Sequence, residues 1–203
     1  MRDPRRRRAR RPHSSGGATD TARLFFALWP DAIARAQLGR WGADLQRTCG
    51  GRRVRDAQLH VTLAFLGDVS VERLPELRAL AESLVGPGFT LRFDVPGYWP
   101  RRRLVWAAPA MIPDGLTVLA GSLARVLEAA GFRTEDRPYF PHATLLRDAR
   151  DLVLPALGGF EWRVRDFVLV ESELESNGST YRVVGRWPLA AGESAPVADT
   201  ENR

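Results

Sequence analysis

The sequence predicts an α+β domain with mainly antiparallel strands. Strand-like segments outnumber the three segments with helical periodicity, and the two kinds alternate irregularly along the chain. An Asn-Gly pair at positions 177 and 178, typical of tight hairpins, separates the last two strand-like segments. A regular parallel sheet would need a crossover helix between successive strands, so the pattern favours α+β.

The folded part is expected to begin at Arg23 with a buried strand. Residues 24–29 form a short apolar run that ends at a Trp-Pro pair. Residues 31–47 then place apolar side chains at helical spacing, and the glycines at 50 and 51 predict the end of this helix.

A second strand and a second helix are expected next. Residues 59–66 predict a strand, with a turn expected at Gly67 and Asp68. Residues 71–84 repeat leucine at helical spacing, with Ser70 as the expected N-cap and a Gly-Pro pair as the stop signal.

The middle of the chain predicts two strands and a third helix. Residues 89–95 alternate apolar and polar side chains, as in a half-buried strand, and residues 101–108 are rich in Val and Trp. Residues 115–130 have leucine-rich helical periodicity, and Gly131 is the expected C-terminal cap.

The last part of the domain predicts strands alone. Residues 141–146 begin with a proline, which a strand tolerates at its first position. Residues 160–174 supply one long or two short strands, and residues 180–189 supply the last.

The charge of the chain is concentrated at its N-terminus. All 30 basic residues are arginines, and seven of them lie in residues 1–20 beside only two acidic residues, which leaves the rest nearly neutral. We expect residues 1–22 to be a disordered arginine-rich tail, 23–189 to be the domain, and 190–203 to be a flexible tail. The body has no overall field that would by itself indicate nucleic-acid binding.

The cysteine count and the hydropathy of the chain indicate where in the cell the protein is expected. The single cysteine, Cys49, excludes an internal disulfide and a cysteine-cluster zinc site. No segment approaches the roughly 18 continuous apolar residues of a membrane helix. We expect a cytoplasmic monomer that does not contact the membrane.

Two of the three histidines stand in matching tetrads. These are His60-Val-Thr-Leu63 and His142-Ala-Thr-Leu145, each in a predicted strand. Side chains at positions i and i+2 of a strand share a face. Each tetrad therefore presents an imidazole and a hydroxyl, from Thr62 or Thr144, to the same space.

This set of groups suits phosphodiester cleavage. A base must activate the nucleophile and an acid must protonate the leaving oxygen, and histidine can do either near neutral pH. The threonine hydroxyls can hold the phosphate oxygens. Arg147, three residues beyond Thr144, could stabilise the extra charge of the transition state if it curls back, or else be a solvated arginine at the end of the strand.

A metal site is the main chemical alternative, and the sequence does not favour it. Neither tetrad contains Asp or Glu, and no His-x-x-x-His spacing exists. The chain also lacks a Gly-x-x-x-x-Gly-Lys loop and a Gly-x-Ser-x-Gly elbow. We expect no metal and no cofactor.

The chain resembles the 2H phosphoesterase superfamily, and within it the bacterial RNA 2′,3′-cyclic phosphodiesterases formerly called 2′-5′ RNA ligases. The segments that carry the resemblance are Arg23-Leu-Phe-Phe-Ala-Leu, Leu59-His-Val-Thr-Leu-Ala-Phe-Leu-Gly67, Arg103-Leu-Val-Trp106, Arg137-Pro-Tyr-Phe-Pro-His-Ala-Thr-Leu-Leu-Arg-Asp148 and Trp187-Pro-Leu189. The resemblance implies two lobes with antiparallel-rich sheets, related by pseudo-two-fold symmetry around a central cleft, with helices on the outside.

The resemblance also implies a reaction and two roles. The enzyme would open a terminal RNA 2′,3′-cyclic phosphate, or a small cyclic nucleotide, to a 2′-phosphomonoester without metal. His60 would be the proton donor to the departing 3′ oxygen, and His142 the proton acceptor that activates water. Thr62, Thr144 and Arg147 would bind the substrate phosphate.

Two other interpretations stay open. The same tetrads serve enzymes that make or break 2′-5′ linkages, so 2′-5′ RNA ligation in the reverse direction fits the motifs as well. A non-catalytic RNA-binding module could also retain the cleft. The arginines at 101, 102 and 103 could line an RNA path beside the cleft or form a solvated turn.

Overall fold

The computed structural model describes residues 20–135, 137–150, 154–175 and 178–191. The predicted tails at 1–22 and 190–203 lie almost wholly outside the described residues. The elements are β1 (Thr21–Leu28), α1 (Ala32–Cys49), β2 (Arg52–Arg53), η1 (Asp56–Gln58), β3 (Val61–Ser70), η2 (Val71–Arg73), α2 (Leu74–Glu82), β4 (Phe89–Phe93), β5 (Val95–Trp99), β6 (Leu104–Ala108), α3 (Asp114–Ala129), β7 (Ala143–Arg147), β8 (Phe160–Val164), β9 (Asp166–Glu175) and β10 (Gly178–Pro188), where η marks a 3₁₀ helix.

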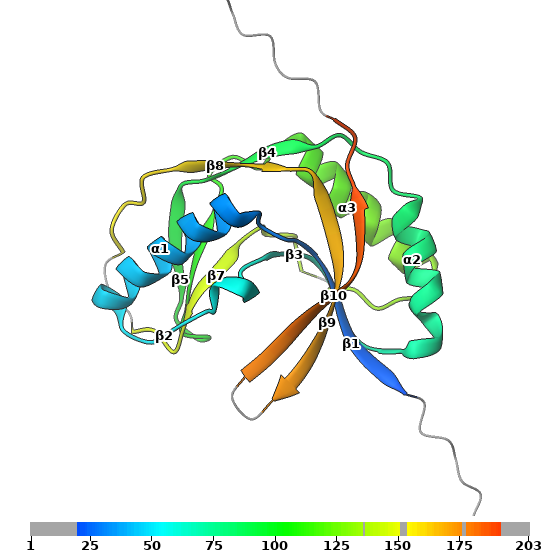
Figure 1. The fold of residues 1–203 in the computed structure, drawn as a ribbon, viewed down its shortest axis with the longest axis horizontal. Coiled ribbons are helices and arrows are strands. Elements are labelled where there is room, and N and C mark those ends of the chain that lie inside the picture. Colours follow the sequence, from blue (N-terminus) through cyan, green and yellow to red (C-terminus); the bar gives the residue numbers. More distant parts are fainter. Residues whose placement is uncertain (1–19, 136, 151–153, 176–177, 192–203) are drawn as a thin grey trace, which may run out of the picture.

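The main sheet consists of two halves joined by a narrow seam. Its strand order is β10-β9-β1-β3-β7-β6-β5, with β2 added to β7, and the named strands all pair antiparallel. Between β3 and β7 the only residues in register are Val61 and Ala143. Figure 1 shows the halves as the two sides of an arch, which β4 and β8, a separate two-stranded sheet, cross at the top. The predicted α+β class is confirmed.

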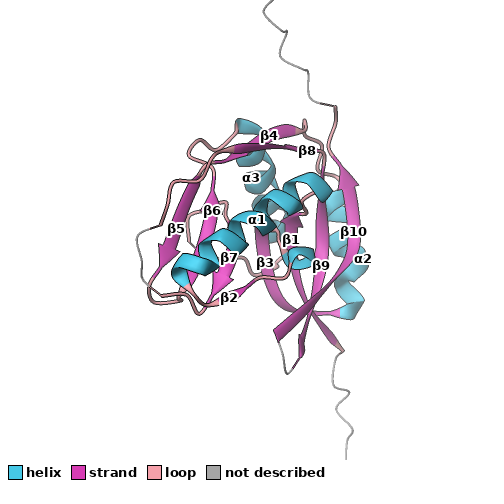
Figure 2. Ribbon diagram, turned by 60° about the vertical axis from the view of Figure 1, so that its left-hand side comes forward, coloured by secondary structure: helices cyan, strands magenta, loops and turns pink. Residues whose placement is uncertain are grey.

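Helices α1 and α3 each pack on the half of the sheet that does not contain the strand preceding them in the chain. Helix α1 follows β1 in the chain but packs against β7 and β8 (Figure 2). Helix α3 follows β6 but packs against α2 and β3. Each side of the arch is therefore built from segments of both the first and the second half of the chain.

Helix α1 has the predicted start, end and apolar face. The Asp31 side chain caps it by accepting a hydrogen bond from the Ala34 backbone N–H at 2.9 Å, and Gly50 ends it with a φ of 61°. Leu38 and Leu45 are fully buried, whereas Ile33, in the first turn, is 76% exposed. The burial of this face against β7 and β8 fixes the helix on the sheet.

The turn predicted at Gly67 and Asp68 is wrong, because β3 continues to Ser70. Gly67 has a φ of 69° and lies opposite Leu24, directly after a break in the register with β1. A β-bulge accommodates the left-handed glycine that suggested the turn.

The predicted helix over residues 71–84 begins later than expected. Residues 71–73 form the 3₁₀ turn η2, and α2 begins at Leu74 with Pro75 in its first turn, where no helical N–H is lost. Ser70 makes no side-chain capping bond to this segment, so the N-cap expected there is wrong.

Strand β5 has no counterpart among the predicted elements. Residues 89–95 alternate as expected, but the chain leaves β4 at Phe93 and forms β5 in the other sheet, whereas the predicted strand 101–108 begins only at Leu104. Strand β5 was not predicted because it contains Pro96 and Gly97, which are unfavourable within strands. It lies at the edge of the sheet, where a proline is tolerated.

Cys49 is buried in the main hydrophobic cluster, and burial raises the pKa of its thiol. In the described part of the chain, no helix combines the length and apolar character needed to cross a bilayer.

Candidate active site

The two tetrad histidines occupy equivalent positions in the two halves of the sheet. His60 directly precedes β3, and His142 directly precedes β7. The Nδ1 atom of His60 lies 2.6 Å from the Gln58 carbonyl oxygen, and that of His142 lies 2.9 Å from the Phe140 carbonyl oxygen. A carbonyl only accepts hydrogen bonds, so Nδ1 carries the proton in both rings. The Nε2 atoms are left to exchange protons with a substrate.

The residues of each tetrad alternate as the strand period predicts. Val61 and Ala143 are fully inaccessible to solvent, whereas Thr62 and Thr144 are only partly buried and line the same cleft as the histidines. This cleft has a volume of about 670 Å³. The structure therefore brings both imidazoles and both hydroxyls to one space.

A bulge in β7 brings Arg147 to the same cleft. Thr144 lies opposite Trp106 and Leu146 opposite Val105, so Leu145 is an extra residue in the ladder with β6. Without it, Thr144 and Arg147 would point to opposite faces, because they are three residues apart. The extra residue restores the shared face, and Arg147 lines the cleft.

Strand β3 contains the matching bulge, with a different outcome. Thr62 lies opposite Ala27 and Ala64 opposite Phe26, so the tetrad leucine, Leu63, is again the extra residue. The side chain brought into the cleft on this side is Phe65, which Arg23 covers at 4.8 Å from the ring centre. The two halves are alike in backbone but place an aromatic ring on one side and a cation on the other.

Aromatic side chains surround His60. The ring of Trp29 stacks on the imidazole with 5.7 Å between centroids, Phe25 lies at 5.0 Å, and the edge contact with Tyr181 is at 5.3 Å. Gln58, whose carbonyl accepts the Nδ1 proton, also donates its side-chain amide to the Ser179 carbonyl. These contacts fix the orientation of the ring and remove water from its faces.

A comparable set surrounds His142 on the other side of the cleft. Trp99 makes an edge contact at 4.6 Å and Phe140 stacks at 5.8 Å. Trp106 contacts both of these rings in turn, at 5.5 Å from Trp99 and 5.0 Å from Phe140. The indole of Trp106 also lies against Gly97. None of these aromatic contacts was predicted, because Trp99 and Trp106 come from strands distant in the chain and the stacking of Phe140 depends on how the loop before β7 folds.

The environment of the cleft favours the neutral form of both histidines. Burial is the main cause that lowers the pKa of His60 to about 4, and the positive charges of His142 and Arg147 add to it, whereas the hydrogen bond to Gln58 opposes it. Burial also lowers the pKa of His142, helped by Arg137 and Arg102 and opposed by the Phe140 carbonyl and Glu135. Both imidazoles line the same cleft, so the two rings can act on one bound group.

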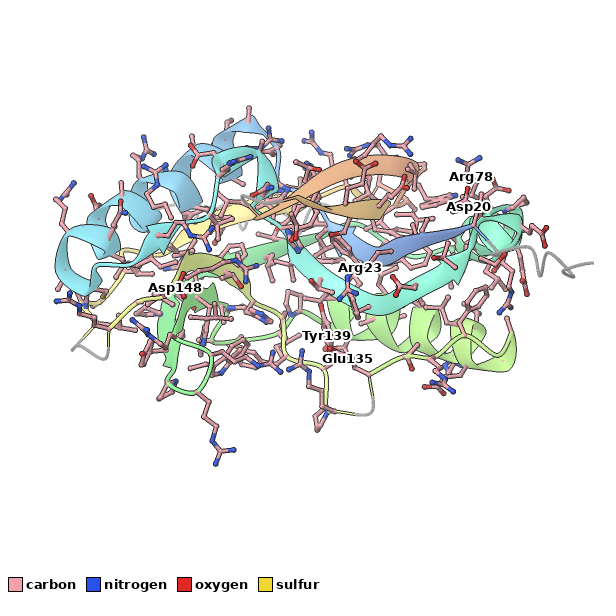
Figure 3. The ribbon with its side chains drawn as sticks, turned by 90° about the horizontal axis from the view of Figure 1, so that it is seen from below. Asp20, Arg23, Arg78, Glu135, Tyr139 and Asp148 are labelled. Carbon is pink, nitrogen blue, oxygen red and sulfur yellow. The ribbon has the colours of Figure 1, made fainter. Side chains whose placement is uncertain are left out.

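The cleft is strongly basic although the body of the chain is nearly neutral. Its lining contains one acidic side chain, Glu135, and six arginines, at positions 23, 52, 53, 55, 102 and 147. Figure 3 views the arch from its open side and labels Arg23, on β1, and Glu135, in the loop before β7. The arginines are scattered in sequence, so the bulk charge did not reveal this field.

The arginines at 101–103 have three different positions. Arg102 lines the cleft, and Arg101 is exposed in the turn between β5 and β6. Arg103 has a φ of 52° and donates to the Asp148 and Ala149 carbonyls, so it secures the end of β7. Among the described residues, no group of three or more His, Cys, Asp or Glu side chains could hold a metal ion.

A bilobal α+β fold with a His-x-Thr-Leu tetrad on each side of a basic cleft defines a phosphoesterase of the two-histidine class. A family model described as LigT like Phosphoesterase matches the chain twice, over residues 28–106 and 107–181. Each match contains one tetrad. The chain belongs to this family.

Relatives and solved structures agree with this assignment. The chain is 39% identical over 173 residues to the RNA 2′,3′-cyclic phosphodiesterase of Escherichia coli strain K12, covering 84% of this chain and 98% of the relative. It is 35% identical over 178 residues to the enzyme of the same name from Thermus thermophilus, covering 82% and 90%. The crystal structure of E. coli LigT complexed with 3′-AMP matches with a TM-score of 0.78 at 38% identity, covering 84% and 99%.

Proposed function

We propose that this enzyme opens terminal RNA 2′,3′-cyclic phosphates to 2′-phosphomonoesters, with His60 and His142 as its acid and base and without a metal ion. The observation that carries the proposal is the pair of equivalent imidazoles, each with its Nδ1 proton held by a backbone carbonyl, in one arginine-lined cleft. Relatives at 39% and 35% identity carry the name RNA 2′,3′-cyclic phosphodiesterase, which supports the substrate and the reaction class.

The proposed reaction uses the two Nε2 atoms as base and acid. His142 Nε2 takes a proton from a water molecule, and the water oxygen attacks the phosphorus. The bond from phosphorus to the 3′ oxygen breaks, and His60 Nε2 donates its proton to that oxygen. The products are a free 3′ hydroxyl and a 2′-phosphate, and solvent exchange restores the starting protonation. The resemblance to the family supplies this direction, since the two sites are nearly symmetric.

Thr62, Thr144 and Arg147 bind the phosphate in this proposal. The threonine hydroxyls share the faces of the two imidazoles and can hold the non-bridging oxygens. Arg147 has no ion pair among the described residues, so its charge is available to the negative charge that develops in the transition state.

A proton donor must be charged when substrate is bound, although the pKa of His60 is lowered to about 4 in the empty cleft. The negative charge of the bound phosphate offsets this lowering of the pKa. An anion about 4 Å from the imidazolium gains about 4 kcal/mol at the effective dielectric typical of partly buried sites. That gain is comparable with the cost of charging the ring, so binding of the cyclic phosphate converts His60 to its acid form.

Product analysis on a short RNA ending in a 2′,3′-cyclic phosphate, in excess EDTA, tests the proposal. We expect a 2′-phosphate product, and His60→Ala and His142→Ala should each lower kcat by at least ~10²-fold. A 3′-phosphate product, a loss of activity with EDTA, or a nearly active single variant would contradict the reaction, the metal independence or the catalytic pair, respectively.

Assays with the same protein and similar RNAs distinguish two other functions from this one. Ligation through a 2′-5′ linkage uses the same acid and base with a 5′ hydroxyl in place of water, so an RNA with a 2′,3′-cyclic phosphate and a second RNA with a free 5′ hydroxyl should yield a small amount of joined product at high concentration. A non-catalytic RNA-binding module would bind both RNAs and change neither.

A further inference from the structure

Two arginines of the cleft stand opposite each other across a pair of strands. Strand β2 pairs with β7 so that Arg52 lies directly opposite Arg147, and both side chains line the cleft. Directly opposed residues of an antiparallel pair have Cα atoms only about 4.5–5.5 Å apart and side chains on the same face. Two guanidinium groups in this arrangement repel each other, which destabilises the pairing unless an anion lies nearby.

The protein itself neutralises little of this charge. Arg52 has one ion pair, to Asp148 at 3.5 Å, and both side chains are more than 60% exposed. Figure 3 labels Asp148, which follows the last residue of β7. Exposed pairs of this kind contribute little. Arg53, by contrast, is bound to Asp56 at 2.9 Å.

Arg55 adds a further positive charge to the cleft beside β7, because the chain after β2 continues along β7 with a hydrogen bond from the Val54 N–H to the Leu145 carbonyl. It lies in the connection between β2 and η1, is exposed, and lines the same cleft. Among the described residues it has no ion pair. Arg147, Arg52 and Arg55 therefore line the cleft from β7, β2 and the connection after β2, as three cations of which only Arg52 has an acidic partner in the described part of the chain.

We propose that Arg52 and Arg55 form a second phosphate subsite, which binds the phosphate on the 5′ side of the terminal nucleotide while Arg147 contacts the cyclic phosphate. This inference rests on the proposed function and deepens it, because it makes the substrate an RNA chain rather than a cyclic mononucleotide. Guanidinium groups bind phosphate oxygens with charge-assisted and often bidentate hydrogen bonds, which suits this role.

A comparison of three substrates separates the effect of the 5′-phosphate from that of the second nucleoside of the RNA. The substrates are a nucleoside 2′,3′-cyclic phosphate, the same compound with a 5′-phosphate, and a dinucleotide ending in the cyclic phosphate. We expect kcat/KM to rise about tenfold on adding the 5′-phosphate, as for a charge-assisted hydrogen bond, and the dinucleotide to retain that gain. A gain seen only with the dinucleotide would assign the subsite to the second nucleoside and overturn the proposal.

Variants connect the gain to these arginines. In Arg52→Gln and Arg55→Gln, the ratio of kcat/KM with and without the 5′-phosphate should fall toward one. Arg163→Gln, on an exposed position of β8 outside the cleft, is the matched control and should keep the full ratio. Arg55 lies outside the strands, so its variant tests the subsite without disturbing β2. An unchanged ratio in both cleft variants would overturn the proposal.

Binding measurements separate this inference from the proposed function. If the protein opens none of the three substrates, the proposed function fails. Fluorescence anisotropy with labelled dinucleotides, each ending in a 3′-phosphate, then tests the subsite alone. Arg52→Gln should reduce the slope of log affinity against log salt by about 0.7, the value for one phosphate contact on a single strand. An unchanged slope would exclude the contact.

Discussion

Replacing His60 by Gln should reduce the acid sensitivity that the cleft gives to the fold. Burial beside aromatic rings lowers the pKa of this imidazole from 6.5 to about 4. A glutamine at this position does not titrate, yet its amide N–H can still donate to the Gln58 carbonyl that accepts the Nδ1 proton in the wild type. The variant therefore changes the titration while keeping the local hydrogen bond.

The magnitude and sign follow from proton linkage. Below pH 6.5 the unfolded chain binds a proton at His60 that the folded chain binds only near pH 4, so acid favours the unfolded state between these values. The stabilising contribution of the neutral ring is complete above pH 6.5 and is lost as the pH falls to about 4. At 1.36 kcal/mol per pH unit, this loss is at most ~3 kcal/mol, since His60 is only partly buried.

Urea unfolding at pH values from 7.5 to 4 provides the assay. The free energy of unfolding of the wild type should fall more with acid than that of His60→Gln, by up to ~3 kcal/mol between pH 7.5 and pH 4. Carboxylates titrate equally in both proteins and cancel in the difference. Thr62→Val, two residues along the same strand, is the matched control because it cannot titrate and should shift the free energy by the same amount at every pH. Parallel curves for the wild type and His60→Gln would refute the reasoning.

Three further predictions concern charge, packing and the N-terminal tail. Arg147→Gln should lower kcat/KM on a 2′,3′-cyclic phosphate about 10²-fold, as expected for one lost contact to transition-state charge; a loss below threefold would remove Arg147 from the site. Gly97→Ala should destabilise the fold by at least ~2 kcal/mol in urea, because the added Cβ overlaps the Trp106 indole, whereas Gly121→Ala, in open space on α3, should stabilise it by ~0.5–1 kcal/mol. Deleting residues 1–19 should weaken RNA binding at low salt and leave turnover of a small cyclic nucleotide intact, since the excess positive charge lies there; a large loss of turnover would place the tail in the site.

Local sequence patterns were sufficient for most elements and for the core of the candidate site. The apolar residues of helix α1 recur with the 3.6-residue period of a helix, and those of β3 and β7 with the two-residue period of a strand. The type of each element was therefore predictable. The two-residue period of a strand also predicts that Thr62 lies beside His60 and Thr144 beside His142. These predictions depend only on neighbours in the chain.

The features that were missed depend on pairing between distant segments. The extra residue in β7 that directs Arg147 into the cleft is defined by its register with β6, which no local pattern shows. Likewise, Arg52 becomes part of the site only because β2 pairs with β7. The aromatic rings around His60 and His142 come from several strands and loops, so their effect on the two pKa values could not be anticipated.

The crossing of α1 and α3 between the two sides of the arch has a consequence for how the protein is made. The first half of the chain emerges from the ribosome with α1 but without β7 and β8, the strands that cover its apolar face. Such long-range contacts delay folding until late segments are available. Fragments 20–106 and 107–191, which follow the boundary between the two family matches, should therefore be unfolded when separate and regain activity only when mixed, in contrast to two independently folding repeats.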